Sequence, residues 1–434
     1  MENRIGTLLI VTAILLLIDF YVFQAVKSSF PNQNEKKKKW LMRGYWFVVA
    51  ITIAGVFLGV FLSIGRLLRT ILFVWFFIHY FSKLFAVPFL LIDDFRRGII
   101  WLARVIRVSS APLSNRNSNT ENETNSESLE ITAVKNGMTR SEFLSKTGLV
   151  MAGLPFVTMN YGMISNNVYD YQIKRKTIYL PNLPKNFDGI KIGQISDVHS
   201  GSFYNKTAVQ GGVDMLNAEK CDVVFFTGDL VNDRTSEMKD YTNIFDKVKA
   251  PLGVFSILGN HDYGDYVQWP SAAAKQKNLE DLYVVHKNLG WDLLRNENRS
   301  LKIGNEEIAI IGVENWGSSL RFPRKGDIEK AKIGTEEAPV KLLLSHDPSH
   351  WRAQILPNHK DIDMMFAGHT HGMQFGIQFG DLQWSPAQYV YPEWSGLYEN
   401  QQQKLYVNVG YGFLGFPGRV GILPEITIFE LKRG

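Results

Sequence analysis

The chain has 434 residues, which is enough for two or three folded units. Its formal net charge of +5 comes largely from the run Lys36 to Lys39 and from arginines beside apolar segments. Membrane topology explains such charges better than a nucleic-acid partner does, so no binding specific for nucleic acid is expected. The single cysteine, Cys221, excludes an internal disulfide framework and a cysteine-rich zinc site.

Residues 1–107 predict a membrane region of about three transmembrane helices plus an interfacial helix. The three apolar runs have about the length that crosses a bilayer, and they cover residues 5–26, 45–64 and 70–92. Asp19 is the only charge in the first run, which predicts that it faces the interior of a helix bundle. The segment "DDFRRGIIWLARVIR" is too short to span and predicts an amphipathic helix on the membrane surface.

Residues 108–138 are polar and rich in Asn, Ser and Glu, which predicts a flexible linker. Residues 139–165 resemble a twin-arginine export signal, but only Arg140 of the arginine pair is present. A fourth transmembrane segment and a buried helix are the alternatives. Because "KKKKWLMR" should stay in the cytoplasm, both the signal and the fourth span place the following domain outside the cytoplasm.

Residues 166–434 predict one α/β domain, because short apolar runs alternate there with helical or loop segments. Five of these runs end in polar clusters, and ligands of α/β sheets bind beyond the carboxyl ends of the strands. The clusters therefore predict one convergent site. Their polar residues are Asp197, His199, Asp229, Asn260, His261, Asp262, His346, Asp347, His369 and His371.

Each cluster alone has an ordinary explanation as a helix cap, a turn or a structural histidine. Together, imidazole and carboxylate without thiolate suit Zn, Mn, Fe or Ni. Two such cations, roughly 3.5–4 Å apart and bridged by a carboxylate, clamp a phosphate oxygen and lower the pKa of a bridging water. A turn within "GHTH" would let His369 and His371 each approach a different metal.

The series D-x-H, GD, GNHD, a lone His and GHTH resembles the calcineurin-like metallophosphoesterase superfamily. All five blocks occur in order across residues 190–375, and the resemblance covers roughly residues 176–432. "GHTHGMQ" and "GRVGILPEITIFEL" are similar to a membrane-anchored bacterial branch with a GHTHG-type motif, in which Met373 stands where a second glycine is usual. The resemblance implies a four-layer αββα sandwich with the metals at the strand ends between two sheets.

The resemblance also implies a role for each matched residue. Asp197, His199 and His371 would hold the first metal, and Asn260, His346 and His369 would hold the second, with Asp229 bridging the two. His261 would protonate or stabilise the leaving oxygen. Asp262 would orient His261 as a hydrogen-bond acceptor, unless it is a simple turn residue. The metals would be Mn, Fe or Zn.

A dense group of aromatic residues predicts either a loop that faces the bilayer and admits a lipid-linked phosphoester, or a packed subcluster. These residues are Trp384, Tyr389, Tyr391, Trp394 and Tyr398. Arg419 would bind a substrate phosphate or serve as a structural ion-pair partner.

The predicted protein is a multi-pass membrane phosphoesterase with an extracytoplasmic catalytic domain. A hydroxide that bridges the metals would hydrolyse a phosphomonoester, phosphodiester or pyrophosphate of a lipid-linked or cell-envelope substrate. A non-catalytic receptor or scaffold on the same fold is the alternative, although such a protein would be expected to lack a ligand. A transporter is disfavoured, because few polar residues lie in the apolar runs.

Overall fold

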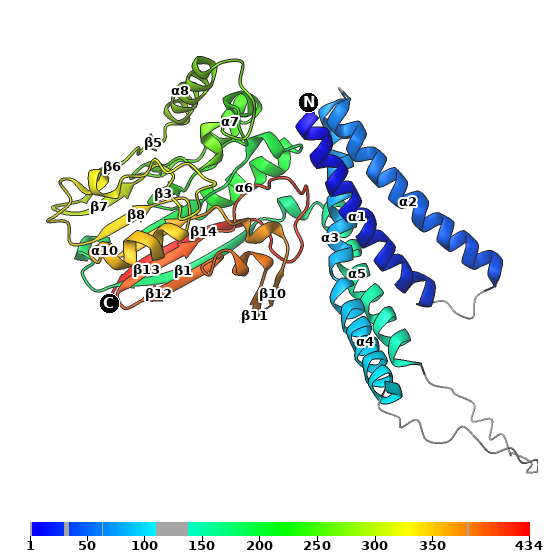
Figure 1. Cartoon of the computed structure of the whole chain (residues 1–434). Coiled ribbons are helices and arrows are strands. Elements are labelled where there is room, and N and C mark those ends of the chain that lie inside the picture. The colour runs from blue at the N-terminus through cyan, green and yellow to red at the C-terminus, as the bar shows by residue number, and fades with distance from the viewer. Residues whose placement is uncertain (1, 30–33, 63, 110–137, 380–381) are drawn as a thin grey trace, which may run out of the picture. The chain divides into compact units, whose positions relative to one another are not determined.

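The computed structural model describes residues 2–29, 34–62, 64–109, 138–379 and 382–434. The chain divides into two compact units, Met1–Asn160 and Tyr161–Gly434 (Figure 1). Most of the predicted linker, residues 110–137, lies outside the described residues. The predicted domain boundaries at residues 107, 138 and 165 stay predictions.

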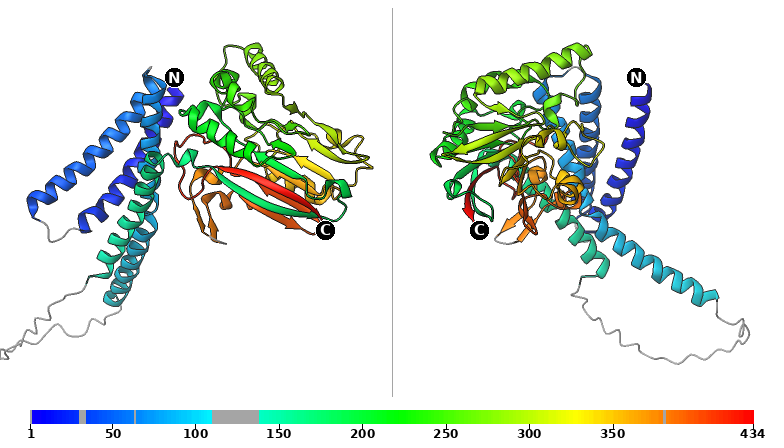
Figure 2. Two further views of the ribbon diagram at one scale, coloured as in Figure 1. Left: turned by 180° about the vertical axis from the view of Figure 1, so that it is seen from behind. Right: turned by 90° about the vertical axis from the view of Figure 1, so that its left-hand side faces the viewer.

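Long helices make up the first unit (Figure 2). They are α1 (Glu2–Ser29), α2 (Glu35–Phe61), α3 (Arg66–Leu84), α4 (Val87–Ser109) and α5 (Arg140–Ile164). Four stretches of described helix are long and apolar enough to cross a membrane, judged by length and composition. These stretches are Ile5–Ser29, Glu35–Phe61, Leu68–Ile106 and Arg140–Ile164.

The predicted third apolar segment, residues 70–92, contains parts of two helices. Helix α3 ends at Leu84, and α4 begins at Val87. Pro88 explains this break, because it has no backbone N–H to donate to the carbonyl of Leu84 and its ring would clash with that carbonyl. In the first turn of α4 the same proline is well tolerated. The segment predicted as a separate surface helix lies within α4.

Asp19 is buried inside the first unit, as predicted from its position in an apolar run. The Tyr80 hydroxyl donates a hydrogen bond of 2.8 Å to Oδ2 of Asp19, and Lys83 forms an ion pair with Oδ1. The Tyr45 hydroxyl donates to the backbone carbonyl of Asp19 at 2.8 Å. A buried charge in an apolar bundle needs such partners, and here they join α1, α2 and α3.

Two six-stranded sheets form the frame of the second unit. In spatial order the first sheet contains β1 (Gln172–Leu180), β14 (Glu425–Arg433), β2 (Lys191–Ile195), β3 (Val223–Phe226), β4 (Val254–Ser256) and β5 (Asp292–Leu293). The second contains β12 (Gly396–Asn400), β13 (Gln403–Val407), β9 (Met364–Ala367), β8 (Lys341–Leu344), β7 (Glu306–Gly312) and β6 (Glu297–Ile303). Strands β2 to β5 run parallel, as do β13, β9, β8 and β7.

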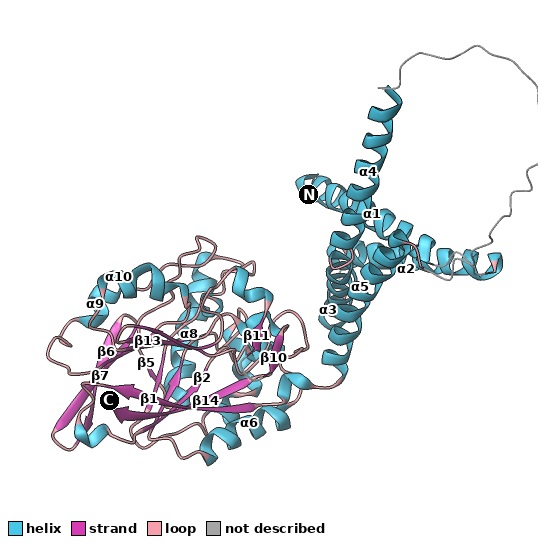
Figure 3. Cartoon of the chain, turned by 90° about the horizontal axis from the view of Figure 1, so that it is seen from below, coloured by secondary structure: helices cyan, strands magenta, loops and turns pink. Residues whose placement is uncertain are grey.

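The two sheets pack face to face, and helices cover their outer faces (Figures 1 and 3). Alternation along β3 illustrates the layering: Val223 and Phe225 lie in the core between the sheets, and Val224 and Phe226 lie in the core under the helices. The first sheet is covered by α6 (Lys206–Ala218), α7 (Thr242–Phe245) and α8 (Ala272–Leu289). The second is covered by α9 (Ile328–Lys332) and the helical turns Trp351–Ile355 and α10 (Leu356–Asn358). The predicted four-layer αββα sandwich is confirmed.

A separate two-stranded hairpin, β10 (Ile377–Phe379) and β11 (Leu382–Trp384), follows the last predicted motif. It begins six residues after His371, at the end of the loop that leaves β9. The hairpin thus projects from the segment that carries the GHTH sequence.

Candidate metal centre

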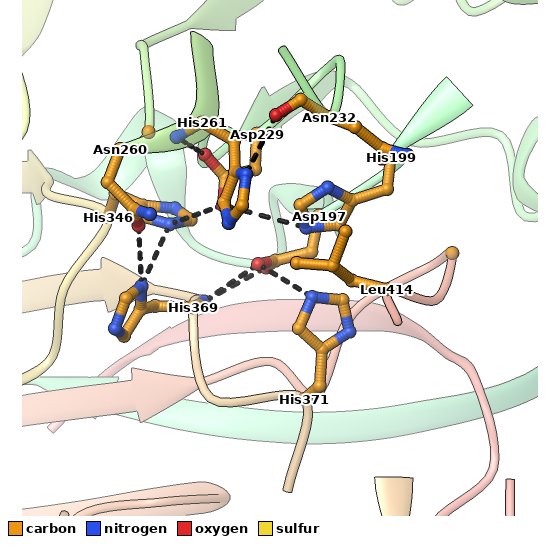
Figure 4. A network of polar contacts seen from close by, with 12 residues as sticks. Asp197, His199, Asp229, Asn232, Asn260, His261, His346, His369, His371 and Leu414 are labelled. Atoms are coloured by element: carbon orange, nitrogen blue, oxygen red, sulfur yellow. Dashed lines mark hydrogen bonds and ion pairs between the residues drawn. The ribbon is translucent and has the colours of Figure 1, made fainter. Parts of the chain in front are cut away.

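The predicted site residues gather at the carboxyl ends of five strands (Figure 4). Strands β2, β3 and β4 are neighbours in the first sheet, and β8 and β9 are neighbours in the second. Each strand is followed within five residues by its polar cluster. The residues brought together are Asp197, His199, Asp229, Asn260, His261, His346, His369 and His371.

Six of these residues form two groups that could each hold a metal ion. Asp197, His199 and His371 make up the first group, and one ligand atom from each lies within 4.8 Å of the others. Asp229, His346 and His369 make up the second group by the same distance. Asn260 adjoins the second group, since its Oδ1 lies 2.8 Å from Nδ1 of His369.

The carboxylate of Asp229 touches both groups. Its Oδ2 lies 3.1 Å from Nε2 of His346 in the second group and 3.6 Å from Nε2 of His199 in the first. Its Oδ1 accepts a hydrogen bond of 2.8 Å from the backbone N–H of His261. One oxygen of Asp229 is therefore placed to be shared between two cations, while the other holds the carboxylate in position.

The buried polar atoms fit metal ions. His199 is fully buried, yet neither of its ring nitrogens has a hydrogen-bond partner among the described residues, and neither has Nε2 of His371. A buried polar atom without a partner costs about 1–3 kcal/mol, which a coordinated cation would offset. The buried carboxylates of Asp197 and Asp229 form no ion pair with a described lysine or arginine, and their ion pairs are with histidines.

The pKa values follow from this charge pattern. Burial opposes the ionisation of Asp197 and Asp229, but neighbouring histidines hold the pKa of both carboxyls well below the usual value. Burial lowers the pKa of His346, yet Asp229 and Asp197 more than offset it and raise that pKa to about 10. Burial lowers the pKa of His199, which favours the neutral imidazole that a metal requires. A positive charge beside these buried carboxylates would therefore stabilise the site.

The backbone is strained where the candidate ligands lie. Five of them adopt the left-handed conformation, with positive φ angles of 55° at Asp197, 47° at His199, 60° at Asp229, 74° at His369 and 49° at His371. Each such angle costs of order 1–3 kcal/mol, and strain of this kind clusters at functional sites. The two histidines of "GHTH" are thereby turned so that each reaches a different ligand group.

Glycines bring the two sheets close to the ligands. Gly228 precedes Asp229 with φ of +98°, and a Cβ there would lie 2.8 Å from Nδ1 of His346. A Cβ at Gly368 would overlap Ser196 and Asp197. The glycines of the GD and GHTH motifs are therefore required by close approach between β2, β3, β8 and β9.

Backbone carbonyls and a tyrosine orient the histidines from outside the two groups. The carbonyl of Thr227 lies 2.7 Å from Nδ1 of His346, which assigns a proton to Nδ1 and leaves Nε2 to face Asp229 and His369. The Tyr391 hydroxyl lies 2.7 Å from Nε2 of His369. Contacts to carbonyls have no signature in the sequence, and Tyr391 was predicted only as one of several aromatic residues.

His261 and Asp262 are arranged differently from the prediction. The carboxylate of Asp262 accepts hydrogen bonds from the backbone N–H groups of Asp229, Leu230, Val231 and Gly259, at 2.9–3.2 Å. The prediction that Asp262 orients His261 is therefore wrong. Nδ1 of His261 instead lies 2.8 Å from the backbone carbonyl of Asn232. Asp262 holds the loops that carry Asp229, because its oxygens reach four N–H groups at once.

Arg419 lies fully buried beside His371. Its Nη2 donates to the carbonyls of Val409, Gly410 and Gly412 at 2.6–3.2 Å and lies 3.3 Å from Nδ1 of His371. Burial lowers the pKa of Arg419 to about 10. These contacts favour the structural alternative, with carbonyl oxygens in place of the expected carboxylate, and phosphate binding by Arg419 stays a prediction.

The aromatic segment divides into packed and exposed parts. Trp394 is buried, and the Tyr398 hydroxyl accepts a hydrogen bond of 3.2 Å from the backbone N–H of Trp394. Tyr391 is half-buried against His369. Trp384 is partly exposed, and Tyr389 is largely exposed. Trp394 and Tyr391 therefore fit the predicted packed subcluster, whereas the exposed Tyr389 fits the alternative of a loop that faces the bilayer.

Known proteins match both units. A family profile described as "Probable Calcineurin-like phosphoesterase, transmembrane domain" matches residues 3–167, and one described as "Calcineurin-like phosphoesterase" matches residues 190–373. The chain is 28% identical over 281 residues to a zebrafish "Transmembrane protein with metallophosphoesterase domain", covering 63% of this chain and 60% of the relative. It is 27% identical over 300 residues to an uncharacterized metallophosphoesterase, YkuE, of Bacillus subtilis, covering 68% and 98%. A Campylobacter jejuni metallophosphoesterase is 28% identical over 278 residues, covering 64% and 67%.

Proposed function

The chain belongs to the calcineurin-like metallophosphoesterase superfamily of phosphoric ester hydrolases, and we propose that it acts through a dinuclear metal centre. The first metal would be held by Asp197, His199 and His371. The second would be held by Asn260, His346 and His369, and Asp229 would bridge the two. The oxygen and nitrogen donors suit Mn, Fe or Zn.

The position of Asp229 carries this proposal. Its Oδ2 is the one carboxylate oxygen within 4 Å of histidines from both groups among the described residues. Two cations that share such an oxygen would polarise a phosphate ester and lower the pKa of a water held between them. A single-metal site would leave one of the two ligand groups, and with it either His199 or His346, without a cation to bind.

His261 is the proposed proton donor to the leaving oxygen. Its Nδ1 faces the carbonyl of Asn232, so that Nδ1 carries a proton and Nε2 remains available for transfer. The ring is half-buried and packs edge-on against His199, with centroids 5.0 Å apart. As the bond between phosphorus and the leaving oxygen breaks, that oxygen would take a proton from Nε2 of the protonated ring, which would be left neutral with its other proton on Nδ1, and a hydroxide oxygen would form the new bond to phosphorus.

The substrate is proposed to be a phosphomonoester, phosphodiester or pyrophosphate of a lipid-linked or cell-envelope molecule. The apolar helices of the first unit support this proposal, because they tether the domain to a membrane. We place the catalytic domain on the extracytoplasmic side. A membrane-impermeant thiol reagent tests the side on intact cells that carry Val284→Cys, since Val284 is 54% exposed on α8. Labelling only after the cells are opened would contradict it.

Metal analysis and turnover of the full chain test the reaction. Asp229→Ala should lower the metal content and abolish turnover of 4-nitrophenyl phosphate and its bis-aryl diester. Asp281→Ala is the matched control, because the ion pair of Asp281 among the described residues is with Lys277 on the surface of α8. Normal turnover in Asp229→Ala would refute the bridging role. A parent protein that binds metal but hydrolyses neither ester would favour the receptor alternative.

The role of His261 is separable from metal binding. His261→Ala should lower the turnover rate about 100-fold or more while both metals stay bound, because general acid catalysis contributes about that factor. Loss of a metal ion in this variant would make His261 a ligand instead. An ester with a better leaving group should be less affected, since its oxygen needs no proton.

A further inference from the structure

Large apolar side chains gather on the surface of the second unit at β10, β11 and the loop that follows. We call this set the apolar ridge: Ile377 (51% exposed), Phe379 (83%), Leu382 (60%), Tyr389 (76%) and Val390 (62%). Nε1 of Trp384 donates to the Tyr389 hydroxyl at 3.4 Å and so joins the hairpin to the loop. An exposed apolar set of this kind marks an interaction surface.

The hairpin turns its apolar face outward and its polar face toward the domain. Its ladder pairs Ile377 with Trp384, Gln378 with Gln383, and Phe379 with Leu382. Direct cross-strand partners share a face, so the apolar pairs lie on one face and the glutamines on the other. The glutamine face turns toward the domain, where Nε2 of Gln378 lies 3.5 Å from the Ser395 hydroxyl. A hairpin of a soluble sheet normally buries its apolar face.

Two lysines lie behind the hairpin. Lys174 and Lys176 line a groove of about 230 Å³ together with Gln378 and Gln383. Both are on β1, two residues apart and therefore on the same face of the strand. Neither forms an ion pair with a described residue. Glu425 at the groove is already hydrogen-bonded by the hydroxyls of Tyr406 and Thr427.

We infer that the apolar ridge, with Lys174 and Lys176 on the glutamine side of the same hairpin, is a docking surface for a bilayer that contains anionic lipids. Apolar side chains would enter the acyl boundary, tyrosine and tryptophan would lie at the headgroup level, and the lysines would contact lipid phosphates. An outward apolar face with lysines that form no ion pair with a described residue suits an anionic lipid surface.

The chain sequence supports the bilayer as the occupant. Helix α5 ends at Ile164 and has the length and composition to cross a membrane. Lys174 follows ten residues later, and ten residues of fully extended chain span at most about 35 Å. If α5 spans the bilayer, β1 and its lysines lie within reach of the headgroups. Tethering also raises the effective concentration of the docking surface at the membrane.

Docking would bring the metal centre to the headgroup layer. Tyr389 and Val390 of the ridge directly precede Tyr391, whose hydroxyl contacts His369. A phosphoester in a lipid headgroup would then be presented to the centre without leaving the bilayer. This consequence for the substrate rests on the proposed function, whereas the docking itself does not.

Spin labels on the full chain in liposomes test the docking. In a Cys221→Ala background, labels at Phe379→Cys and Leu382→Cys should be accessible to oxygen but protected from a water-soluble nickel chelate. Val284→Cys on α8 should show the opposite pattern. Equal chelate accessibility at all three positions would overturn the proposal. Dipolar coupling between labels at Phe379→Cys would instead indicate a second copy of the chain and would also overturn it.

Lipid composition tests the charge contribution. Protection of the two hairpin labels should increase when phosphatidylglycerol is added to phosphatidylcholine. The double variant Lys174→Glu with Lys176→Glu should lose this increase, and the control Lys277→Glu on α8 should keep it. If protection does not depend on the anionic lipid, the assignment of the lysines is wrong.

Kinetics separate the docking from the proposed reaction. The double variant Phe379→Ser with Leu382→Ser should hydrolyse a bilayer phosphoester about tenfold or more slowly, with turnover of a soluble aryl diester within about twofold. Equal turnover of the bilayer ester by parent and variant would refute the consequence for the substrate. Absence of soluble turnover in the parent would refute the proposed function, while the spin-label result would still decide the docking.

Discussion

The Tyr391 hydroxyl lies 2.7 Å from Nε2 of His369, while Nδ1 of the same ring faces Oδ1 of Asn260 at 2.8 Å. The two ring nitrogens therefore face different partners, with Nδ1 turned toward the second ligand group. If Nδ1 is the metal ligand, Nε2 carries the proton and donates it to Tyr391. This contact fixes the ring orientation from outside the metal centre, as neighbours of metal-bound histidines commonly do.

Removing that hydroxyl should weaken the second metal site. Tyr391→Phe keeps the ring, whose centroid lies 5.3 Å from that of His369, and loses only the hydrogen bond. We expect metal affinity to fall about 10- to 100-fold, measured by chelator competition. Tyr389→Phe is the matched control, since that hydroxyl contacts Trp384 rather than a ligand. Equal affinities in the two variants would exclude an orienting role for Tyr391.

Met373 occupies a position that suits glycine. Its φ angle is 49°, which costs a residue with a Cβ about 1–2 kcal/mol. Met373→Gly should raise the free energy of unfolding by about 0.5–1 kcal/mol, after subtracting the greater unfolded-state entropy of glycine. Met373→Ala removes the same side chain but keeps the strain and should not stabilise the protein. The thermal midpoints of the two metal-depleted variants are compared with that of the parent protein. A higher midpoint in both variants would contradict the explanation by backbone strain.

His286 should make the folded state sensitive to acid. Burial lowers its pKa from 6.5 to about 3, so the folded protein holds it neutral while the unfolded chain takes up a proton near pH 6.5. The stability is fully present above pH 6.5 and is lost as the pH falls toward 3, at about 1.4 kcal/mol per pH unit. His286→Leu should flatten this slope in denaturant unfolding of the metal-depleted protein. Ser256→Ala, which removes the hydroxyl 3.0 Å from Nδ1, should keep it.

The ion pair between Asp19 and Lys83 should show strong coupling. Asp19→Leu or Lys83→Met alone leaves the other charge buried and should destabilise the protein by about 3–5 kcal/mol. The double variant should be destabilised by less than the sum of the two, because no unpaired charge remains. Unfolding of the purified parent protein, the two single variants and the double variant in detergent gives the four free energies of this double-mutant cycle. Additive effects would show that the two side chains do not interact.

Much of the site could be predicted because each candidate ligand directly follows a buried strand. Val223–Phe226 and Met364–Ala367 are continuous apolar runs, and parallel strands align their carboxyl ends at one edge. The spacing of Asp197, Asp229 and His346 after their strands was therefore sufficient to expect convergence. Residues 93–107 do not form a separate helix but continue α4, because an amphipathic pattern does not by itself mark where a helix begins.

The remaining contacts depend on segments that meet only in the folded chain. Asp262 reaches the N–H groups of the Asp229 loop, and the Asn232 carbonyl takes the place beside His261 that was predicted for Asp262. Arg419 reaches His371 across 48 residues. A carboxylate or guanidinium bonds to whichever backbone group is nearest, and the local sequence does not specify that group.

The order of residues in the chain thus determined the class of fold, the strands that end in candidate ligands and the chemical character of those ligands, because apolar periodicity and residue type are local properties. Tertiary structure decided which oxygen of Asp229 lies between the two groups, which neighbours the ring nitrogens of the histidines face, and that Tyr391 supports a ligand while Phe379 and Leu382 face outward. These outcomes depend on distances between separate strands and loops, which packing of the two sheets establishes.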